Sequence, residues 1–493
     1  MKRTSLVLLL FVSIGLLIYA CSSKDYPSQI GQKETTDYVI PFLTKSAENN
    51  SMPLFKVKPK VITKEMLAGI LSMGLSESSI KNTECYSLKT ISENGTPIIH
   101  SVNFNEGGWA LVAGRELPQN QIIAYCEDGS FDPENIESEE VQFWFNMTKA
   151  SLKQAFEIAD REVESQFETE DTHKEDEENL LSTFSYDDPY VWGRLYLGYQ
   201  NSNMVVAEVG HLTETKWGQF YPWNYKAPSV NGQQCPVGCT AVAVSQMLYY
   251  LHYYLGTPSG CYHTIDTTYT WHNDGYYTSH LTRSDYTAPS SRWGSMSQES
   301  QTLNNGSKYV GDLLIDVADR LYTQFSLSGS SASTSLVPSV FSSYGITCSD
   351  PQSITTAQII SQLNDSMPVI VGGASSLLNG DAHMWIIDGY KEQANITDYQ
   401  YKWVTMPPDS LQYYNNINYD YVLTESQMQQ FYPNVVENQI DHVYSNSYTY
   451  YFRMNWGASG FYNSGYYSAH PSGWILEGSQ YSENTTMITG FSN

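Results

Sequence analysis

The chain has 493 residues, of which 52 are acidic and 26 are basic, so its formal net charge is -26. This length exceeds what one ordinary core needs and predicts two or three domains. No run of Lys or Arg is longer than two residues, and the negative charge repels polyphosphates, so nucleic acid is not expected as a partner.

Residues 1–21 have the pattern of a secretory signal. The cationic start "MKR" is followed by the apolar run "SLVLLLFVSIGLLIYA", which is shorter than the ~20 residues that span a bilayer, and then by Cys21. This order resembles a lipoprotein signal, in which Cys21 becomes the lipidated first residue. An ordinary signal peptide with an incidental cysteine is the alternative. We therefore expect a bacterial cell-envelope protein, either an outer-membrane lipoprotein or secreted.

Residues 22–58 are polar, lack periodicity and are interpreted as a tether. Residues 59–161 predict a small α+β module. "VITKEMLAGILSMG" has the apolar spacing of a helix, and Asn94-Gly95 between two alternating runs is a hairpin signal. "SEEVQFWFNMTKASLKQAFEIADREV" predicts the helix that closes this module.

The segment 162–204 is predicted to be an acidic linker. Nine of the seventeen residues from Glu162 to Glu178 are acidic. A solvated helix end or a flexible linker explains such a run. An exposed linker between folded modules is also a place where proteases cut, so a processing site is a second hypothesis for it.

Residues 205–493 are predicted to form the largest domain. "TAVAVSQMLYYLHY" is apolar on both faces and predicts a buried helix, and "YVGDLLIDVADRLYTQF" predicts another. "TAQIISQLNDSMPVIVGGAS" reads as a helix and then a strand, "DAHMWIIDGY" as a further strand, and the tail from residue 440 as two strands joined by a glycine-bearing turn. Helices first and strands later indicate an α+β architecture.

Cys239 stands at the start of the buried helix, directly after Gly238. A cysteine there sees unpaired backbone N–H groups and the positive end of the helix dipole, which favour the thiolate. Three interpretations are open: a small buried side chain, a disulfide with Cys235, or a nucleophile. A zinc ribbon is not indicated, because the chain has no C-x-x-C pair.

A thiolate nucleophile needs an imidazole that returns a proton, and the imidazole needs an orienting acceptor. His383 opens the apolar strand "HMWIIDGY", 144 residues after Cys239, and Asn455 ends "YYFRMN" 72 residues further on. This order and the Cys–His gap fall in the range of papain-like proteases.

These segments together resemble the streptopain-like cysteine peptidases, a bacterial branch of the papain-like fold, over roughly residues 60–493. "GCTAVAVSQMLYY" is similar to the family's nucleophile segment and "AHMWIIDGY" to its histidine strand. "KWGQFYPWN" is similar to the segment whose glutamine lends an oxyanion donor, here Gln219, and "NWG" to the orienting segment. The resemblance implies Cys239 as nucleophile, His383 as base, Asn455 as orienter and Trp456 packed against the pair.

The resemblance also implies a fold and a domain division. Expected are a helical part, with the nucleophile helix packed on an antiparallel sheet, in a catalytic domain of residues 205–493. Residues 59–161 would be an inhibitory prodomain that is removed by proteolysis. The sequence departs from the family at Ala382, where glycine is usual, and at Ala458-Ser459, and a longer chain between Asp388 and Asn455 predicts an insertion, over residues 391–440.

The implied function is a secreted or lipid-anchored cysteine endopeptidase made as a zymogen. Its partners would be protein or peptide substrates and its own prodomain, and no cofactor or metal is implied. Gln233 is a rival to Gln219 as oxyanion donor by its position alone. Alternatives are an inactive surface binding or adhesion protein on the same scaffold and a transferase that uses the same thioester chemistry.

Overall fold

The computed structural model describes residues 60–75, 78, 80, 83, 86–116, 121–136, 138–169, 190–272, 275–288, 290–374, 382–406, 419–459, 465–468 and 486–493. The chain divides into two compact units, Met1–Phe55 and Lys56–Asn493, and every described residue belongs to the second. The expected signal over 1–21, with Cys21, and the expected tether over 22–58 lie outside the described residues.

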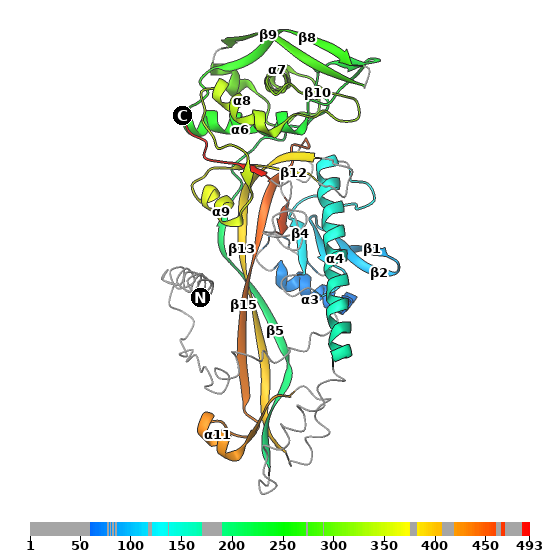
Figure 1. Cartoon of the computed structure of the whole chain (residues 1–493), viewed down its shortest axis with the longest axis vertical. Helices are drawn as coiled ribbons and strands as arrows, with labels where there is room; N and C mark the ends of the chain where they lie inside the picture. The colour runs from blue at the N-terminus through cyan, green and yellow to red at the C-terminus, as the bar shows by residue number, and fades with distance from the viewer. Residues whose placement is uncertain are drawn as a thin grey trace, which may run out of the picture. The chain divides into compact units, whose positions relative to one another are not determined.

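The N-terminal module contains two helices and a four-stranded antiparallel meander (Figure 1). The hairpin predicted at Asn94-Gly95 is confirmed, because both residues adopt positive φ, 50° and 81°, between the first two strands. The predicted opening and closing helices are confirmed as well. The elements are α3 (Lys64–Gly74), β1 (Tyr86–Glu93), β2 (Thr96–Phe104), β3 (Trp109–Ala113), β4 (Ile122–Cys126) and α4 (Glu139–Thr169).

Each face of this meander is covered by one helix. Leu67 and Leu71 of α3 pack against Val102 and Val112 on one face. On the other face α4 contributes apolar side chains, among them Trp144, which pack with the remaining strand residues. The alternation of side chains along each strand explains how a single sheet can serve two cores.

The C-terminal region, from residue 190 on, begins with a long strand and a helical part, followed by the other strands of its sheet. The helical elements are α6 (Cys239–Leu255), η2 (Ser290–Ser295), α7 (Asn305–Arg320), η3 (Thr334–Leu336), α8 (Val337–Ser343), α9 (Thr356–Asn364) and α11 (Glu425–Phe431). The strands are β5 (Val191–Val209), β6 (Ser229–Val230), β7 (Gln233–Gln234), β8 (Cys261–His272), β9 (Tyr276–Ala288), β10 (Gln324–Phe325), β11 (Gln352–Ser353), β12 (Val369–Ala374), β13 (Ala382–Met406), β14 (Tyr419–Thr424), β15 (Ile440–Asn455), β16 (Tyr466–Ser468) and β17 (Thr486–Ile488).

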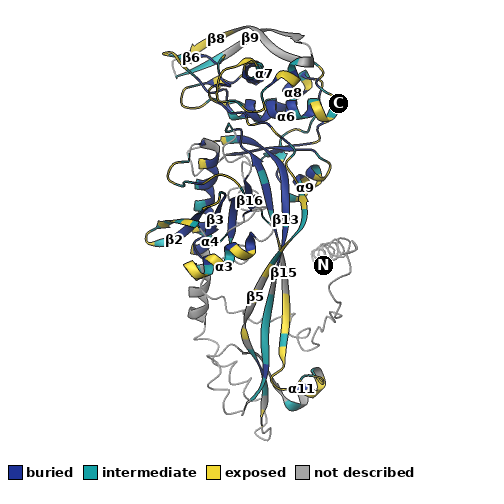
Figure 2. Cartoon of the chain, turned by 180° about the vertical axis from the view of Figure 1, so that it is seen from behind, coloured by how far each residue is buried: buried dark blue, intermediate teal, exposed yellow. Residues whose placement is uncertain are grey.

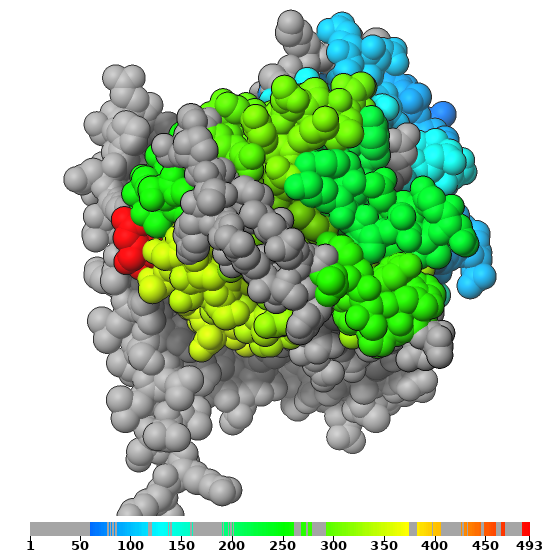
Figure 3. All heavy atoms as spheres, turned by 90° about the horizontal axis from the view of Figure 1, so that it is seen from above, coloured from blue at the N-terminus to red at the C-terminus, as the bar shows by residue number. Residues whose placement is uncertain are grey.

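The predicted α+β class is confirmed, with the helix that begins at Cys239 packed on an antiparallel sheet. Eleven residues of α6 are buried, as its apolar faces predict, and Met384 and Ile386 of β13 lie in the same core as α6 and α7. Figure 2 shows α6 and the adjacent end of β13 as buried. Figure 3 shows the helical part from above, with the N-terminal module only at its edge.

One continuous sheet joins the N-terminal module to the C-terminal region. Its strand order is β1-β2-β3-β4-β16-β15-β13-β12-β17-β11 within the described residues. The junction is short: Tyr466 and Tyr467 of β16 pair with Tyr125 and Ala124 of β4. The module is therefore attached by strand pairing as well as by side-chain packing.

The linker expected over 162–204 is shorter than the sequence suggested. Helix α4 continues to Thr169, and β5 begins at Val191 and pairs with β13. The stretch 170–189 lies outside the described residues. The acidic composition was a poor guide to the second half of the segment, because β5 gains its partners in β13 from residues 181 to 215 positions away.

The insertion expected over 391–440 extends β13 and β15 into a long arm (Figure 1). Strand β13 is paired along the arm with β15 on one edge and with β5 on the other. Strand β14 and helix α11 follow at the far end. We use "the arm" for β5, β13 beyond Tyr390, β14, α11 and β15 from Ile440 to Tyr450.

Candidate active site

Cys239 is the first residue of α6. Gly238 before it has φ 91°, and a Cβ there would lie 3.2 Å from the carbonyl oxygen of Ser330, so glycine suits this turn in both conformation and space. No side chain caps the N-terminus of the helix. The sulfur is half-buried and lies where unpaired N–H groups and the helix dipole favour a negative charge.

The disulfide between Cys235 and Cys239 that the sequence left open is absent, because both residues are free thiols. Two other free thiols, Cys126 and Cys348, are unreactive near neutral pH, since burial raises the pKa of each to about 11. Burial also raises the pKa of Cys235. Of the four free cysteines in the described residues, Cys239 is the one at a helix N-terminus.

Gln219 lies beside the nucleophile turn. Its carbonyl oxygen accepts a 3.0 Å bond from the N–H of Val237, two residues before Cys239, and its side chain is buried. The same strand-like segment contacts the region after the Asn-Trp-Gly motif, because Gly218 forms a bridge with Ala458. Gln233 is instead exposed on the β6–β7 hairpin.

His383 is the second residue of β13, opposite Gly373 of β12. Alternation places its side chain on the face of Trp385 and Ile387, which pack in the core that includes α4, whereas the intervening residues face α6. The ring centroids of His383 and Phe143 of α4 lie 5.1 Å apart at 58°. The ring of the expected base is thus held against the N-terminal module.

Asn455 lies at the end of β15 and is almost completely buried. Its Nδ2 donates to Thr213 Oγ1 at 3.0 Å and to the carbonyl oxygen of Thr215 at 2.9 Å. Its Oδ1 accepts from Gln246 Nε2 and from the N–H of Gly457, both at 3.3 Å. These four bonds use both N–H groups and both lone pairs of the amide in the described state.

Trp456 is buried between β13 and the N-terminal module. Its ring centroid lies 5.1 Å from that of Trp385 and 6.5 Å from that of Trp144 in α4. The side chain therefore extends the aromatic layer beneath His383, on the side where α4 packs.

A buried polar network, which the sequence analysis did not identify, supports the site from below. Asp388 is fully buried, and its Oδ2 accepts from the N–H of Thr213 at 3.1 Å and from its hydroxyl at 2.5 Å. Arg453 pairs with the same oxygen. The network links β13 and β15 to the segment that leads to Gln219. The sequence feature that could have revealed this network is Asp388 within the apolar run "HMWIIDGY", because a buried carboxylate requires partners.

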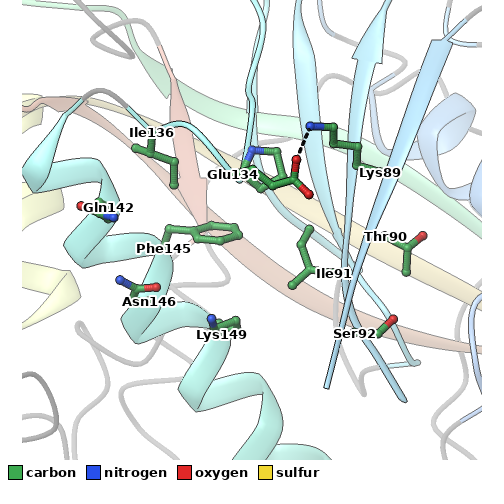
Figure 4. A pocket seen from close by; sticks show the side chains of 11 residues that line it. Lys89, Thr90, Ile91, Ser92, Glu134, Ile136, Gln142, Phe145, Asn146 and Lys149 are labelled. Atoms are coloured by element: carbon green, nitrogen blue, oxygen red, sulfur yellow. Dashed lines mark hydrogen bonds and ion pairs between the residues drawn. The ribbon is translucent and has the colours of Figure 1, made fainter. Parts of the chain in front are cut away.

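Two cavities in the described residues involve the N-terminal module. One of about 340 Å³ separates β1 from α4, and Figure 4 shows Phe145 and Ile91 in its wall and Lys89 bonded to Glu134. The other, of about 320 Å³, lies where that module meets the C-terminal region. It is lined by Glu127, Asp128, His211, Thr213, Glu214, Thr215, Lys216, Arg453, Asn455 and Tyr466. In the described part of the chain no group of three or more His, Cys, Asp or Glu could hold a metal ion.

Residues 217–405, which contain Cys239 and His383, match the peptidase C10 family. None of the curated proteins matches the chain. Among solved structures the chain is similar to a fragment of Prevotella intermedia prointerpain A, a Cys-to-Ala mutant, at 16% identity with a TM-score of 0.47, over 82% of this chain and 98% of that one. It is also similar to active wild-type P. intermedia interpain A cysteine protease, at 18% identity with a TM-score of 0.36, over 58% and 95%.

Proposed function

We propose that this chain, a cysteine-type peptidase of the C10 family by the match over residues 217–405, is a zymogen whose nucleophile is Cys239. One observation carries the proposal. The backbone bond from Val237 to Gln219 ties the segment of Gln219, whose side chain is buried, to the turn that leads into Cys239, a thiol without a disulfide at a helix N-terminus. This proximity of the two segments supports Cys239 as nucleophile and Gln219 as oxyanion donor.

The reaction follows from these groups. The Cys239 sulfur attacks the peptide carbonyl carbon, and the oxygen takes up negative charge beside the Cys239 N–H and the Gln219 side chain. His383 gives a proton to the nitrogen as the C–N bond breaks, which leaves a thioester. His383 then takes a proton from water, the resulting hydroxide attacks the thioester, and the thiolate and a carboxylic acid are released. No cofactor or metal takes part in this scheme.

Asn455 is proposed as a positioning residue that orients the His383 ring in the active enzyme. Its amide is bonded to the 213–215 segment and to Gln246 in the described state. Orientation of the ring therefore requires the exchange of at least one of these bonds when His383 moves. Trp456 is proposed to support the ring through its contact with Trp385.

The N-terminal module, residues 59–161, is proposed to inhibit the catalytic domain of 205–493 by holding the base. Phe143 packs against His383, on the face of β13 opposite to the one that α6 covers. Movement of α4 would free the ring to turn about the end of the strand. The position of His383 as the second residue of β13 makes such a turn local.

A further set of contacts supports this inhibitory role. Lys391 is almost buried, and its Nζ lies 3.5 Å from Glu127 of the N-terminal module and 3.6 Å from Glu208 of β5. The same ammonium lies 4.4 Å from the ring centroid of Tyr466, which stacks on Tyr125 of β4. Lys391 is the buried member of these pairs, and its pairing with Glu127 ties the N-terminal module to β13.

Activation is proposed to involve a cut in the acidic segment between α4 and β5. No basic side chain lies in the last turn of α4, so its end lacks the cation that would stabilise the helix C-terminus. Residues 170–189 connect the two modules. Cleavage there would release α4 without breaking the catalytic sheet.

Export, with Cys21 as a lipid attachment site or with an ordinary signal peptide, stays a proposal from the sequence. It rests on the cationic start, the apolar run and the cysteine that follows it. Among the described residues, no helix has the length and apolarity needed to cross a bilayer.

Thiol labelling of the processed protein tests the Cys–His pair. Iodoacetamide at pH 7 is expected to label Cys239 quickly, and His383→Ala should slow labelling about tenfold or more, because the imidazolium that stabilises the thiolate is lost. Cys126 and Cys348, with pKa values of about 11, should be labelled only as the pH approaches that value. Peptide mapping identifies the labelled residue.

The matched control is His272→Ala, whose ring bonds Thr278 on the β8–β9 hairpin. This substitution should leave the labelling rate of Cys239 unchanged. Slow labelling of Cys239 that does not depend on His383 would instead favour the inactive binding or adhesion protein. Incubation with an unfolded protein tests the transferase, because fragments of that protein appear only if the chain is a peptidase.

Phe143→Ala is expected to speed self-processing of the purified zymogen about tenfold, because the ring that holds His383 is lost. The measurement is the rate at which the mature form appears. Phe145→Ala is the control, since Phe145 is equally buried on α4 and packs on Phe131 instead. If both variants accelerate processing alike, general loosening of α4 and not the ring contact is responsible.

A further inference from the structure

Gln246 is a buried polar side chain of α6 that takes no part in the proposed reaction. It is fully buried, in a helix whose other buried side chains are mostly apolar. It lies seven residues after Cys239, which is two turns, or about 10 Å, along the same face of the helix. A buried amide is costly unless it is hydrogen-bonded, so its partners indicate what this position does.

The Gln246 side chain joins two segments that come from different parts of the chain. Its Nε2 donates to Asn455 Oδ1 at 3.3 Å, and its Oε1 accepts from the hydroxyl of Thr215 at 3.1 Å. Thr215 and Asn455 are bonded to each other as well, because Asn455 Nδ2 donates to the carbonyl oxygen of Thr215 at 2.9 Å. These three buried residues form a closed network where α6, the end of β15 and the 211–216 segment meet.

Backbone groups fix the direction of the bonds in this network. The carbonyl of Thr215 can only accept and the N–H of Gly457 can only donate, so Asn455 presents Nδ2 to the first and Oδ1 to the second. Because Oδ1 can only accept, Gln246 must present its Nε2 there, which leaves its Oε1 for the Thr215 hydroxyl. The Gln246 amide is thus matched to the one orientation that the Asn455 amide can take.

The backbone after Asn455 lies directly on the same part of α6. Gly457 has φ 69°, and a Cβ there would lie 2.8 Å from Cγ1 of Val242 and 4.0 Å from Nε2 of Gln246. Any side chain at this position would force the turn away from the helix. The Asn-Trp-Gly turn is therefore seated on α6, with Gln246 as its polar contact.

One side chain thus links the helix that begins at Cys239 to the amide at the end of β15, beside the strand of His383. We propose that Gln246 is a positioning residue of the peptidase, which holds the Asn455 amide at a fixed place against α6 and so sets where the His383 imidazole meets the sulfur. Gln246 keeps its bond during activation, and the exchange that brings in the imidazole falls on Thr213, in a segment without regular secondary structure. This inference rests on the proposed function.

Gln246→Met tests the proposal, because methionine has the length of glutamine and no N–H to donate. Hydrolysis of a short peptide by the processed enzyme should show kcat lowered about tenfold and KM within about twofold, since a misplaced imidazole slows the chemistry and Gln246 is buried away from substrate. Ser245→Ala is the matched control. Ser245 is buried on the same helix, its hydroxyl has no hydrogen-bond partner in the described part of the chain, and its loss should change neither constant.

Asn455→Ala distinguishes positioning from a general loosening of α6. If Gln246 acts through Asn455, each single substitution lowers kcat about tenfold, and the double variant loses no more than Asn455→Ala alone. Losses that multiply to about a hundredfold would overturn the proposal, because the two residues would then act independently. Wild-type kcat in Gln246→Met would overturn it as well.

Thr215→Val provides a second test if Gln246→Met does not fold. Valine resembles threonine in shape but lacks the hydroxyl, so Gln246 Oε1 loses its donor while the Thr215 carbonyl stays on Asn455. In a variant whose circular dichroism is native, kcat should fall about threefold with KM unchanged, and an unchanged kcat would dismiss the proposal. A wild type that hydrolyses no peptide would overturn the proposed function and this inference with it, whereas an active wild type with unaffected variants overturns the inference alone.

Discussion

Cys239→Ala is expected to abolish hydrolysis, with kcat lowered by about 10⁵-fold or more, because removal of a nucleophile leaves only the contribution of the oxyanion donors and of binding. Residues 22–493, purified with Cys239 intact or replaced, should differ in size over time. The intact protein is expected to convert to a shorter mature form, and the variant is expected to remain at full length.

Cys348→Ala is the control for this experiment. Cys348 is also a half-buried free thiol, but it lies beyond α8 and its pKa is raised to about 11, so its loss should leave conversion and hydrolysis unchanged. If the Cys239 variant matures at the wild-type rate in purified form, self-cleavage is wrong. If the matured variant also hydrolyses a peptide normally, Cys239 is not the nucleophile.

Gln219→Ala is expected to lower kcat by roughly 10²- to 10³-fold, the usual cost of losing one oxyanion donor, with little change in KM. The effect is confined to kcat because the oxyanion exists only in the transition state and the intermediate that follows it. Steady-state kinetics of the processed enzyme on a short peptide measure both constants. Circular dichroism checks that the buried position tolerates the change.

Gln233→Ala discriminates between the two glutamines that the sequence offered. Gln233 is exposed on the β6–β7 hairpin, so its loss should leave kcat within about twofold. The opposite outcome, a large loss at Gln233 and none at Gln219, would reverse the assignment. If Gln219→Ala raises KM and leaves kcat unchanged, Gln219 contributes to substrate binding instead of transition-state stabilisation.

Local features of the chain were predictable because they depend on neighbours in sequence. The apolar spacing behind Cys239 predicts a buried helix wherever that helix packs, and the structure buries it as α6. The Asn-Gly turn predicts the first hairpin through positive φ at both residues. The order of Cys239, His383 and Asn455 predicts a reaction type, since thiol, imidazole and amide have few other joint uses.

Contacts between distant segments were not predictable in this way. The junction of β4 with the three-residue β16 joins positions more than 300 residues apart, and nothing local in "GYYSA" indicates that it receives a second module. The insertion over 391–440 has its partner, β5, in the segment that composition suggested was a linker. Pairing of strands is decided by the partner edge as much as by the strand itself.

The amino-acid sequence alone determined the buried helix that begins at Cys239, the strand that contains His383 and the sign of the net charge. Tertiary structure decided the state in which these parts are found, with His383 against Phe143 and with the Asn455 amide bonded to Thr213 and Thr215. The reason is physical. The identity of a side chain fixes its chemistry, but its partners are selected by which strand face and which helix the folded chain brings within hydrogen-bond or van der Waals distance.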